Sequence, residues 1–268
     1  MIKRSKEFIH STKYLLMRFA VFGLILISWE LLANTGVMNP FYTSQPSRIF
    51  ADLIQFYNSG DLVKHTSVTL KEALWGLAIG TVIGIIAGFI LGLVDILGKV
   101  FEPIITALYG IPKLALAPIF VLWFGLGIES KIIMASLLVF FLVFFSTYAG
   151  IKSVDRNLLT SVKLMGASRF QLIIKVILPS CVPWILAGVR GGLGASLIGA
   201  IVGEYMGASA GLGWMISYAT SFFQVDRVMA CIFILFFIGI IFNMLLKNIE
   251  KVLLKWRPPI DYGGSGSI

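Results

Sequence analysis

Three charged residues lie in or beside stretches of sequence that are otherwise free of charge, and they are the first candidates for chemistry. Lys113 follows Pro112, Arg190 interrupts the run Val176–Gly203, and Glu204 ends that run. An ionised side chain inside a membrane is costly, so such residues face protein or water and mark substrate or ion pathways. The two cations suit an anionic substrate. The alternative is that the side chains extend to the nearest interface, which we favour for Glu204.

The sequence contains no motif for nucleotide hydrolysis or metal catalysis. The nearest match to a phosphate-binding loop is Gly92–Val100, which has five residues between its glycines instead of four and a valine where a hydroxyl group should bind magnesium. His10 and His65 are isolated, and Cys181 and Cys231 stand in apolar sequence as expected of small buried residues. We therefore expect no catalytic residue, no metal site and no cofactor in this chain.

The amino-acid composition indicates the class of fold that must position the three charged residues. Of the 268 residues, 58% are hydrophobic and only 13% are charged, against about 25% charged in a soluble domain. This hydrophobicity excludes a disordered chain and argues against a soluble enzyme. The net charge of +9 is spread between long apolar runs instead of one soluble face, so we expect no nucleic-acid partner. The predicted fold class is all-α, a polytopic membrane protein.

Six charge-poor stretches are long enough to cross a bilayer core of about 30 Å. They cover approximately residues 15–33, 68–94, 103–125, 131–151, 178–203 and 228–248. A seventh charge-free stretch, Tyr205–Val225, is interrupted by glycines, and we interpret it as a turn and a short interfacial helix. With six spans and a cytoplasmic N-terminus, fifteen basic residues lie on the cytoplasmic side and five outside, as the positive-inside rule requires. A seventh span would place the basic C-terminal residues outside.

The remaining sequence belongs to the same predicted membrane domain, residues 1–262. Residues 46–58 form an amphipathic pattern that predicts a helix on the outer membrane surface. Residues 263–268 are rich in glycine and serine and resemble a linker or tag remnant.

The largest segment on the predicted cytoplasmic side covers residues 152–177. Asp155 or Ser153 can cap a short helix there, Gly166 can end it, and a second helix is expected to end before Pro179. Apolar residues at helical spacing in the first helix are Leu158, Leu159, Val162 and Met165. This apolar face must be buried on the chain itself, on lipid or on a partner, and we favour a cytosolic partner.

Glycines recur every fourth residue in the second predicted span, at Gly76, Gly80, Gly84, Gly88 and Gly92. A similar series follows in and after the fifth span, at Gly188, Gly192, Gly199, Gly203, Gly207 and Gly211. Such stripes let another helix approach closely. They predict either tight packing within one subunit or a sliding or dimer-forming face.

Several motifs together resemble a known family. Ile111–Pro118, Leu122–Gly127 and Tyr148–Val154 are similar to the permease subunits of ATP-binding-cassette importers, most of all to the nitrate, sulfonate and taurine branch. Gly203-Glu204 and Gly211–Gly213 also resemble the pattern of this branch. The likeness covers most of the chain and implies the fold of a type I importer.

Residues 152–177 are similar to the coupling signature of this family, which contacts the ATPase subunit. The resemblance assigns that contact to Asp155, Leu158, Leu159, Thr160, Gly166, Ala167, Ser168 and Pro179. Thr160-Ser161-Val162 stands where the family has Glu-Ala-Ala. This departure removes the glutamate that normally contacts the ATPase but keeps the apolar docking surface.

The resemblance implies a complete importer in the cell membrane of a prokaryote, with both termini of this chain cytoplasmic. Its partners would be two ATP-binding subunits that use ATP and magnesium, a second permease copy, and an extracytoplasmic solute-binding protein. The mechanism would be alternating access. The cargo would be an anion such as a sulfonate, taurine or nitrate, with a vitamin or vitamin precursor as the alternative.

Two other classes of function compete with this interpretation. A secondary transporter or channel working alone would need an internal ion or proton site, and Lys113, Arg190 and Glu204 are few for that purpose. An integral-membrane enzyme would need clustered His, Asp or Glu residues near one interface, and the sequence shows no such cluster.

Overall fold

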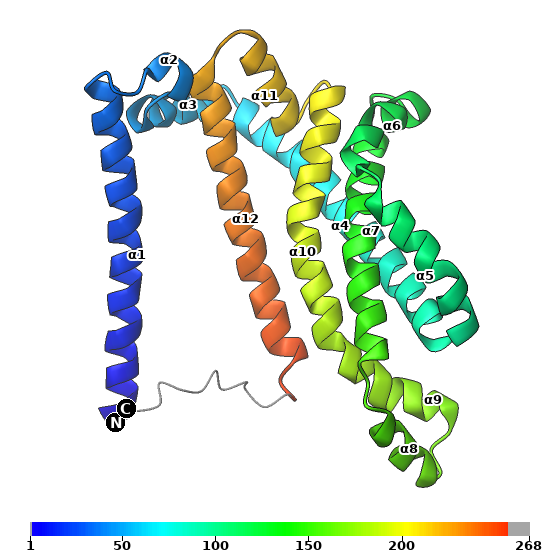
Figure 1. The fold of residues 1–268 in the computed structure, drawn as a ribbon. Coiled ribbons are helices and arrows are strands. Elements are labelled where there is room, and N and C mark those ends of the chain that lie inside the picture. Colours follow the sequence, from blue (N-terminus) through cyan, green and yellow to red (C-terminus); the bar gives the residue numbers. More distant parts are fainter. Residues whose placement is uncertain (1, 257–268) are drawn as a thin grey trace. The chain divides into compact units, whose positions relative to one another are not determined.

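A computed structural model describes residues 2–256 of the chain, so the predicted tail 263–268 lies outside the described residues. The regular structure of the described part is entirely helical (Figure 1). Its elements are α1 (Ile2–Asn34), α2 (Pro40–Thr43), α3 (Pro46–Asn58), α4 (Asp61–Leu93), α5 (Asp95–Gly110), η1 (Lys113–Leu116), α6 (Ala117–Phe124), α7 (Ile128–Lys152), α8 (Arg156–Leu164), α9 (Arg169–Leu172), η2 (Ile173–Ile177), α10 (Leu178–Met206), α11 (Leu212–Ser221) and α12 (Val225–Leu253).

Five of the described helices are long and apolar enough to cross a membrane, and a bent pair makes up to six. The five are Leu16–Asn34, Asp61–Leu93, Ile128–Lys152, Arg169–Met206 and Val225–Leu253. The bent pair joins Asp95–Gly110 to Lys113–Phe124 at an angle of 81°. The chain is therefore an all-helical polytopic membrane protein. The stretch Tyr205–Val225 contributes only the ten-residue α11.

Several helices begin earlier than the predicted spans, and α4 and α5 are two of them. α4 begins at Asp61 instead of near residue 68, and α5 begins at Asp95 instead of residue 103, so that Pro103 lies inside a helix. A charge-free stretch marks only the segment of a helix that can lie in the hydrocarbon core of the membrane. The extra turns carry charged residues that the protein itself accommodates, such as Asp95, which pairs with Lys152 at 2.7 Å.

The chain divides into two compact units, and the first comprises Met1–Val63 and Met215–Ile234. In this unit Glu30 on α1 accepts hydrogen bonds from the backbone N–H group and the hydroxyl group of Ser47, at 3.0 and 2.8 Å. Arg227 pairs with Asp52 at 2.7 Å and lies over the ring of Phe56, with 4.3 Å from Cζ to the ring centroid. These contacts attach α1 and the start of α12 to α3.

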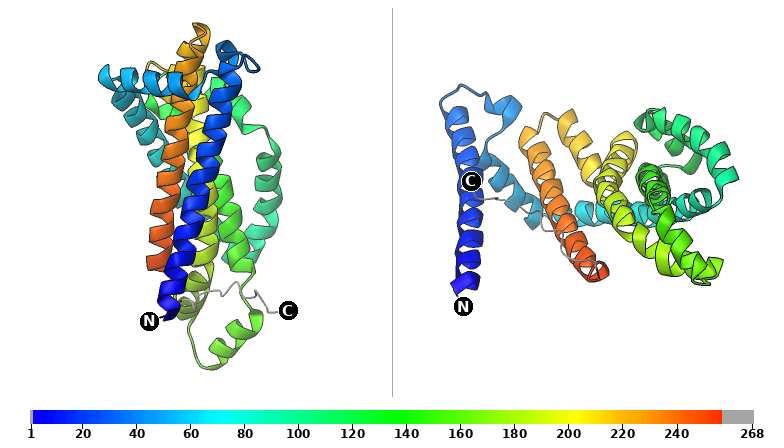
Figure 2. Two further views of the ribbon diagram at one scale, coloured as in Figure 1. Left: turned by 90° about the vertical axis from the view of Figure 1, so that its left-hand side faces the viewer. Right: turned by 60° about the horizontal axis from the view of Figure 1, so that its bottom comes forward.

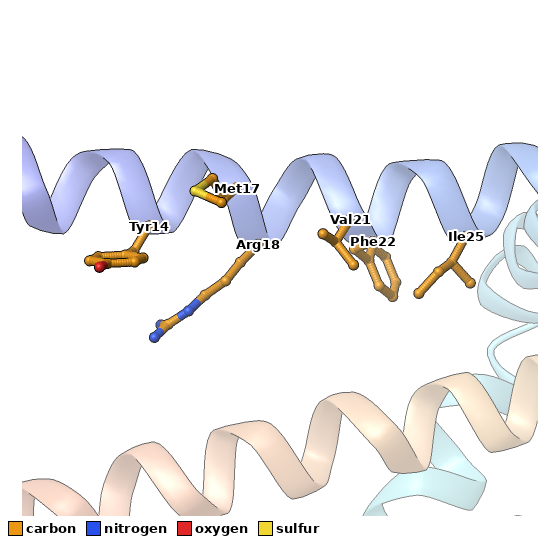
Figure 3. A pocket seen from close by; sticks show the side chains of 6 residues that line it. All are labelled: Tyr14, Met17, Arg18, Val21, Phe22 and Ile25. Carbon is orange, nitrogen blue, oxygen red and sulfur yellow. The ribbon is translucent and has the colours of Figure 1, made fainter.

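Most of the described side chains of α1 are exposed. Figure 3 shows six of them projecting from one face of the helix, where they line a shallow groove. They are Tyr14, Met17, Arg18, Val21, Phe22 and Ile25. A helix with apolar side chains exposed in this way is suited to lipid.

The second unit comprises Lys64–Trp214 and Leu235–Ile268, and α7 is its central helix. Figure 1 shows α10 beside α7 and α4 crossing behind both. The glycine stripe of α4 packs on α7: a Cβ atom added at Gly80 would lie 2.5 Å from the Ser136 carbonyl oxygen, and one at Gly88 would lie 2.7 Å from Thr147 Cβ. The stripe therefore serves close packing within the chain and is not available to a second copy.

The glycines of α10 pack on the same helix. A Cβ atom added at Gly188 would lie 2.8 Å from Ser146 Cβ, and one at Gly199 would lie 2.5 Å from Ala135 Cα. Two glycine faces thus hold α7 between them, which fixes every residue on α7 relative to α4 and α10.

The segment after α7 forms two short helices beyond its end (Figure 2). Asp155 caps α8 by accepting a 2.8 Å hydrogen bond from the Asn157 N–H group. Gly166 has φ +87°, and the N–H groups of Gly166 and Ala167 bond to the carbonyl groups of Lys163 and Val162. This pattern is a Schellman motif. The predicted cap at Asp155 and stop at Gly166 are therefore confirmed.

The predicted end of the second short helix before Pro179 is wrong. α9 continues through the π-helical η2 into α10, giving one helix, Arg169–Met206. Proline cannot donate a backbone hydrogen bond and clashes with the preceding turn of an α-helix. The wider turn, in which the Leu178 N–H group bonds to the Ile173 carbonyl group, lets the helix continue past Pro179.

Candidate functional site

Most of the residues assigned to coupling lie in the loop formed by residues 152–177. Seven of them stand between Asp155 and Ser168, and Pro179 lies farther on, in the first turn of α10. Thr160 is exposed, and its hydroxyl group donates a 2.9 Å hydrogen bond to the Arg156 carbonyl group. Ser168 and Gln171 form a capping box at α9. These caps stabilise the first turns of α8 and α9.

The apolar face predicted for α8 divides into two parts. Leu159 packs against the buried cluster of Ile151, Ile177 and Cys181, so it belongs to the core of the chain itself. Leu158 is exposed. The larger apolar exposure is at the end of the helix, where Leu164 is 83% and Met165 is 86% exposed.

α9 carries a further exposed apolar side chain, and Met165 borders a groove. Phe170 is 70% exposed. The sequence-based prediction did not include it, because that prediction considered only the helical spacing of the residues now in α8. The groove is lined by Val162, Met165, Gly166, Ala167, Gln171 and Lys175. Exposed large apolar side chains beside a groove at the end of a loop are typical of a protein docking surface.

Lys113 lies at the break between α5 and α6. Ile111 has the extended conformation expected before a proline and ends α5. The ammonium group of Lys113 donates a 2.5 Å hydrogen bond to the Tyr109 carbonyl group, which has lost its helical partner. It also lies 3.9 Å from the centroid of the Tyr109 ring and 4.9 Å from that of Phe141. Lys113 therefore contacts protein at this break.

Arg190 is not isolated inside its span. Its guanidinium group pairs with the carboxylate of Glu250 on α12. The Arg190 side chain is half-exposed and that of Glu250 is largely buried. This pair ties α10 to α12 and accounts for an arginine in the middle of a membrane helix.

Glu204 does not extend to an interface, and that interpretation of the sequence is wrong. Its side chain is 1% exposed. The carboxylate accepts hydrogen bonds from the Thr69 hydroxyl group at 2.7 Å and from the Gly213 N–H group at 2.6 Å. A Cβ atom at Gly211 would overlap this carboxylate, so the chain turns here through a glycine with φ +114°.

Further polar residues surround Glu204 and were not predicted as functional. Glu72 on α4 is 2% exposed and Lys131 on α7 is fully buried. Lys131 donates hydrogen bonds to the carbonyl groups of Leu126 and Gly207. The sequence signal was available, because Glu72 and Lys131 each adjoin a long apolar run.

His65 completes this buried polar cluster, which comprises His65, Thr69, Glu72, Lys131 and Glu204. Its Nδ1 atom accepts a 3.0 Å hydrogen bond from the Gly211 N–H group, and its ring stacks on Trp214 with 5.1 Å between centroids. The imidazole is therefore neutral, with its proton on Nε2. Among the described residues, no group of three or more His, Cys, Asp or Glu side chains could hold a metal ion.

The three charged residues predicted for a pathway do not form one site. Arg190 and Glu204 are separated by fourteen residues of α10, or about 21 Å along the helix. Lys113 contacts Phe141, ten residues along α7 from Lys131, which is about 15 Å. The three residues therefore occupy three separate positions along the membrane helices.

Comparison with known proteins identifies this architecture. Residues 80–255, about two thirds of the chain, match the family described as binding-protein-dependent transport system inner membrane component. The formylaminopyrimidine transport permease protein ThiX of Halalkalibacterium halodurans is 34% identical over 96% of this chain and 99% of its own length. The taurine transport system permease protein TauC of Escherichia coli K12 is 30% identical over 89% of both chains.

The fold also has a match among solved structures. The permease of the MetNI methionine ABC transporter, in an inward-facing conformation, aligns with a TM-score of 0.63 at 19% identity and covers 72% of this chain and 95% of its own. The chain therefore belongs to the family of binding-protein-dependent transport system inner membrane components and is a non-catalytic permease subunit of an ABC importer.

Proposed function

We propose that this permease moves its solute by alternating access and that a separate ATPase subunit docks on the residues 152–177 loop. The observation that carries the proposal is the exposure of three large apolar side chains on α8 and α9, Leu164, Met165 and Phe170, of which Met165 lines the groove at Gly166. Exposed apolar patches of this kind mark protein–protein interaction sites. Their apolar character also compensates for Thr160, which stands where relatives of the importer family carry glutamate.

The proposed transmission of force uses a continuous helix. α9 touches the docking surface and continues through η2 into α10, which carries Arg190 and Glu204. A displacement of the loop would therefore move α10 as a rigid body, and α7 would move with it because the glycine faces interlock. A charged contact at position 160 is not needed for this coupling.

The proposed assembly has two ATPase subunits that use ATP and magnesium, a second copy of the permease and an external solute-binding protein. The exposed apolar side chains of Leu122 and Trp123 on α6, at 81% and 69%, are available to the second copy. The distribution of basic residues supports cytoplasmic termini, which would put α8 and α9 in the cytosol.

For the cargo we propose a small anion such as taurine, another sulfonate or nitrate. The cation of Lys113 at the α5–α6 break supports this class, as does the relative that transports taurine. A vitamin precursor is the second candidate, because the relative named for formylaminopyrimidine transport matches over nearly the whole chain.

Uptake by the reconstituted importer tests this function. Proteoliposomes would contain the permease and its ATPase partner, with the binding protein outside and radiolabelled taurine, nitrate or formylaminopyrimidine as alternative cargoes. We expect accumulation of one cargo that requires internal ATP and stops with a hydrolysis-deficient ATPase. Uptake driven by a proton gradient in liposomes holding the permease alone would instead identify a secondary transporter.

A further inference from the structure

Glu204 functions in the buried cluster as an acceptor of hydrogen bonds. Its two carboxylate oxygens accept from Thr69 and from the Gly213 N–H group. The carboxyl group of Glu72 lies within hydrogen-bonding reach of the same side chain. An ionised carboxylate can accept all of these bonds, whereas a protonated one would have to give up an acceptor oxygen.

Glu72 has the opposite surroundings. Among the described residues no hydrogen-bond donor reaches its buried Oε2 atom. A carboxylate oxygen without a donor is expensive in a buried site, but a protonated carboxyl group can turn its O–H group toward a neighbouring acceptor. The Glu72 side chain forms a hydrogen bond with the carboxyl group of Glu204.

The charges of the buried cluster indicate that the Glu72–Glu204 pair holds one proton. Lys131 is the one buried cation of the cluster, and His65 accepts at Nδ1 and is neutral. If both glutamates were ionised, one negative charge would remain uncompensated in the membrane. One proton on the pair makes the cluster electrically neutral, as buried groups of this kind require.

We propose that Glu72 is a permanently protonated positioning residue, which donates its proton in a hydrogen bond to ionised Glu204 and thereby holds the Gly207–Trp214 segment in place. Three successive N–H groups of this segment bond to side chains of the cluster: Gly211 to His65, Leu212 to Thr69 and Gly213 to Glu204. The segment lies at the end of α7 opposite to α8 and α9. The carboxyl pair thus sets the position of the link between α10 and α11.

Amide hydrogen exchange of the full-length permease in nanodiscs tests the positioning role. Glu72→Gln keeps a neutral donor, so we expect the amides of Gly211–Gly213 to exchange as slowly as in the wild type. Glu72→Ala removes the donor, and their exchange should become faster by about tenfold or more. Amides in the middle of α7 are the control and should not change. Equal acceleration in Glu72→Gln and Glu72→Ala would overturn the proposal.

Infrared spectroscopy tests whether the carboxyl pair holds a proton, independently of stability. The wild type should show the carbonyl band of a buried protonated carboxylic acid, and Glu72→Gln should lose it. Glu204→Gln should instead accelerate exchange at Gly213, because an amide offers one acceptor oxygen where the carboxylate offers two. If Glu204→Gln leaves exchange at Gly213 unchanged, the proton resides on Glu204 and our assignment is wrong. This comparison remains decisive even if Glu72→Ala fails to fold.

Discussion

The hydroxyl group of Thr69 donates a 2.7 Å hydrogen bond to Glu204, a residue 135 positions farther along the chain, and both side chains are buried. The same hydroxyl group accepts a 2.8 Å bond from the Leu212 N–H group. One threonine therefore joins three elements: α4, the end of α10 and the start of α11. The Thr69–Glu204 contact therefore connects these three elements through the buried cluster.

Replacing this threonine should weaken the connection between the three elements. Thr69→Val keeps the shape but leaves the Leu212 N–H group without its acceptor and Glu204 without one donor. We expect a loss of about 1–3 kcal/mol in the free energy of unfolding, measured as a lower midpoint of unfolding in detergent. Thr69→Ser retains the hydroxyl group and should stay close to the wild type. A Thr69→Val protein as stable as Thr69→Ser would contradict this role.

The glycine stripe offers a second prediction. Gly80→Ala places a methyl group 2.5 Å from the Ser136 carbonyl oxygen on α7, so the helices must move apart. We expect a destabilisation of about 1–3 kcal/mol, the usual range for overpacking. Gly239→Ala on α12 is the matched control, because its added methyl group meets nothing within 4 Å. If both variants unfold at the same temperature, the stripe does not determine the packing.

The proposed docking surface can be changed without disturbing the core of the chain. Met165→Glu puts a charge on a side chain that is 86% exposed, so folding should be unaffected. We expect the recovery of the ATPase subunit with the purified permease to fall by about tenfold, as for an interface anchor. Met165→Leu preserves the apolar contact and should co-purify normally. Full recovery of the ATPase with Met165→Glu would place the interface elsewhere.

The pair Arg190–Glu250 gives a prediction about stability instead of transport. If Arg190 serves to tie α10 to α12, Arg190→Gln and Glu250→Gln should lower stability to a similar degree. The double variant should be no worse than either single variant, because the interaction is already lost. Solute uptake should retain its selectivity in all three. A change of cargo preference in Arg190→Gln alone would return this residue to the pathway.

The fold class and several local features were predictable because they depend on neighbouring residues. Apolar stretches determine which segments can be membrane helices, and the cap at Asp155 and the stop at Gly166 follow from local hydrogen bonding. The break at Pro112 is local for the same reason. The continuation past Pro179 was missed because the π-helical turn that allows it has no distinct sequence signature.

The buried cluster could not be predicted, because its members come together only through the packing of α4, α7 and α10. Glu72 and Lys131 adjoin apolar runs, and from sequence alone a charge in such a position is as easily at an interface as in the core. Glu204 was assigned to an interface on the same reasoning. Its true environment depends on Thr69, which no spacing rule connects to it.

The most direct test of the central claim, that this permease receives force through its cytosolic loop from a separate ATPase, is the labelling of residue 165 from each side of the membrane. The protein would carry Met165→Cys with Cys181 and Cys231, which are both buried, replaced by alanine. We expect a membrane-impermeant maleimide to label this cysteine only from the cytosolic face, and bound ATPase subunit to block the labelling. Labelling from the external face, or labelling that the ATPase does not protect, would contradict the account.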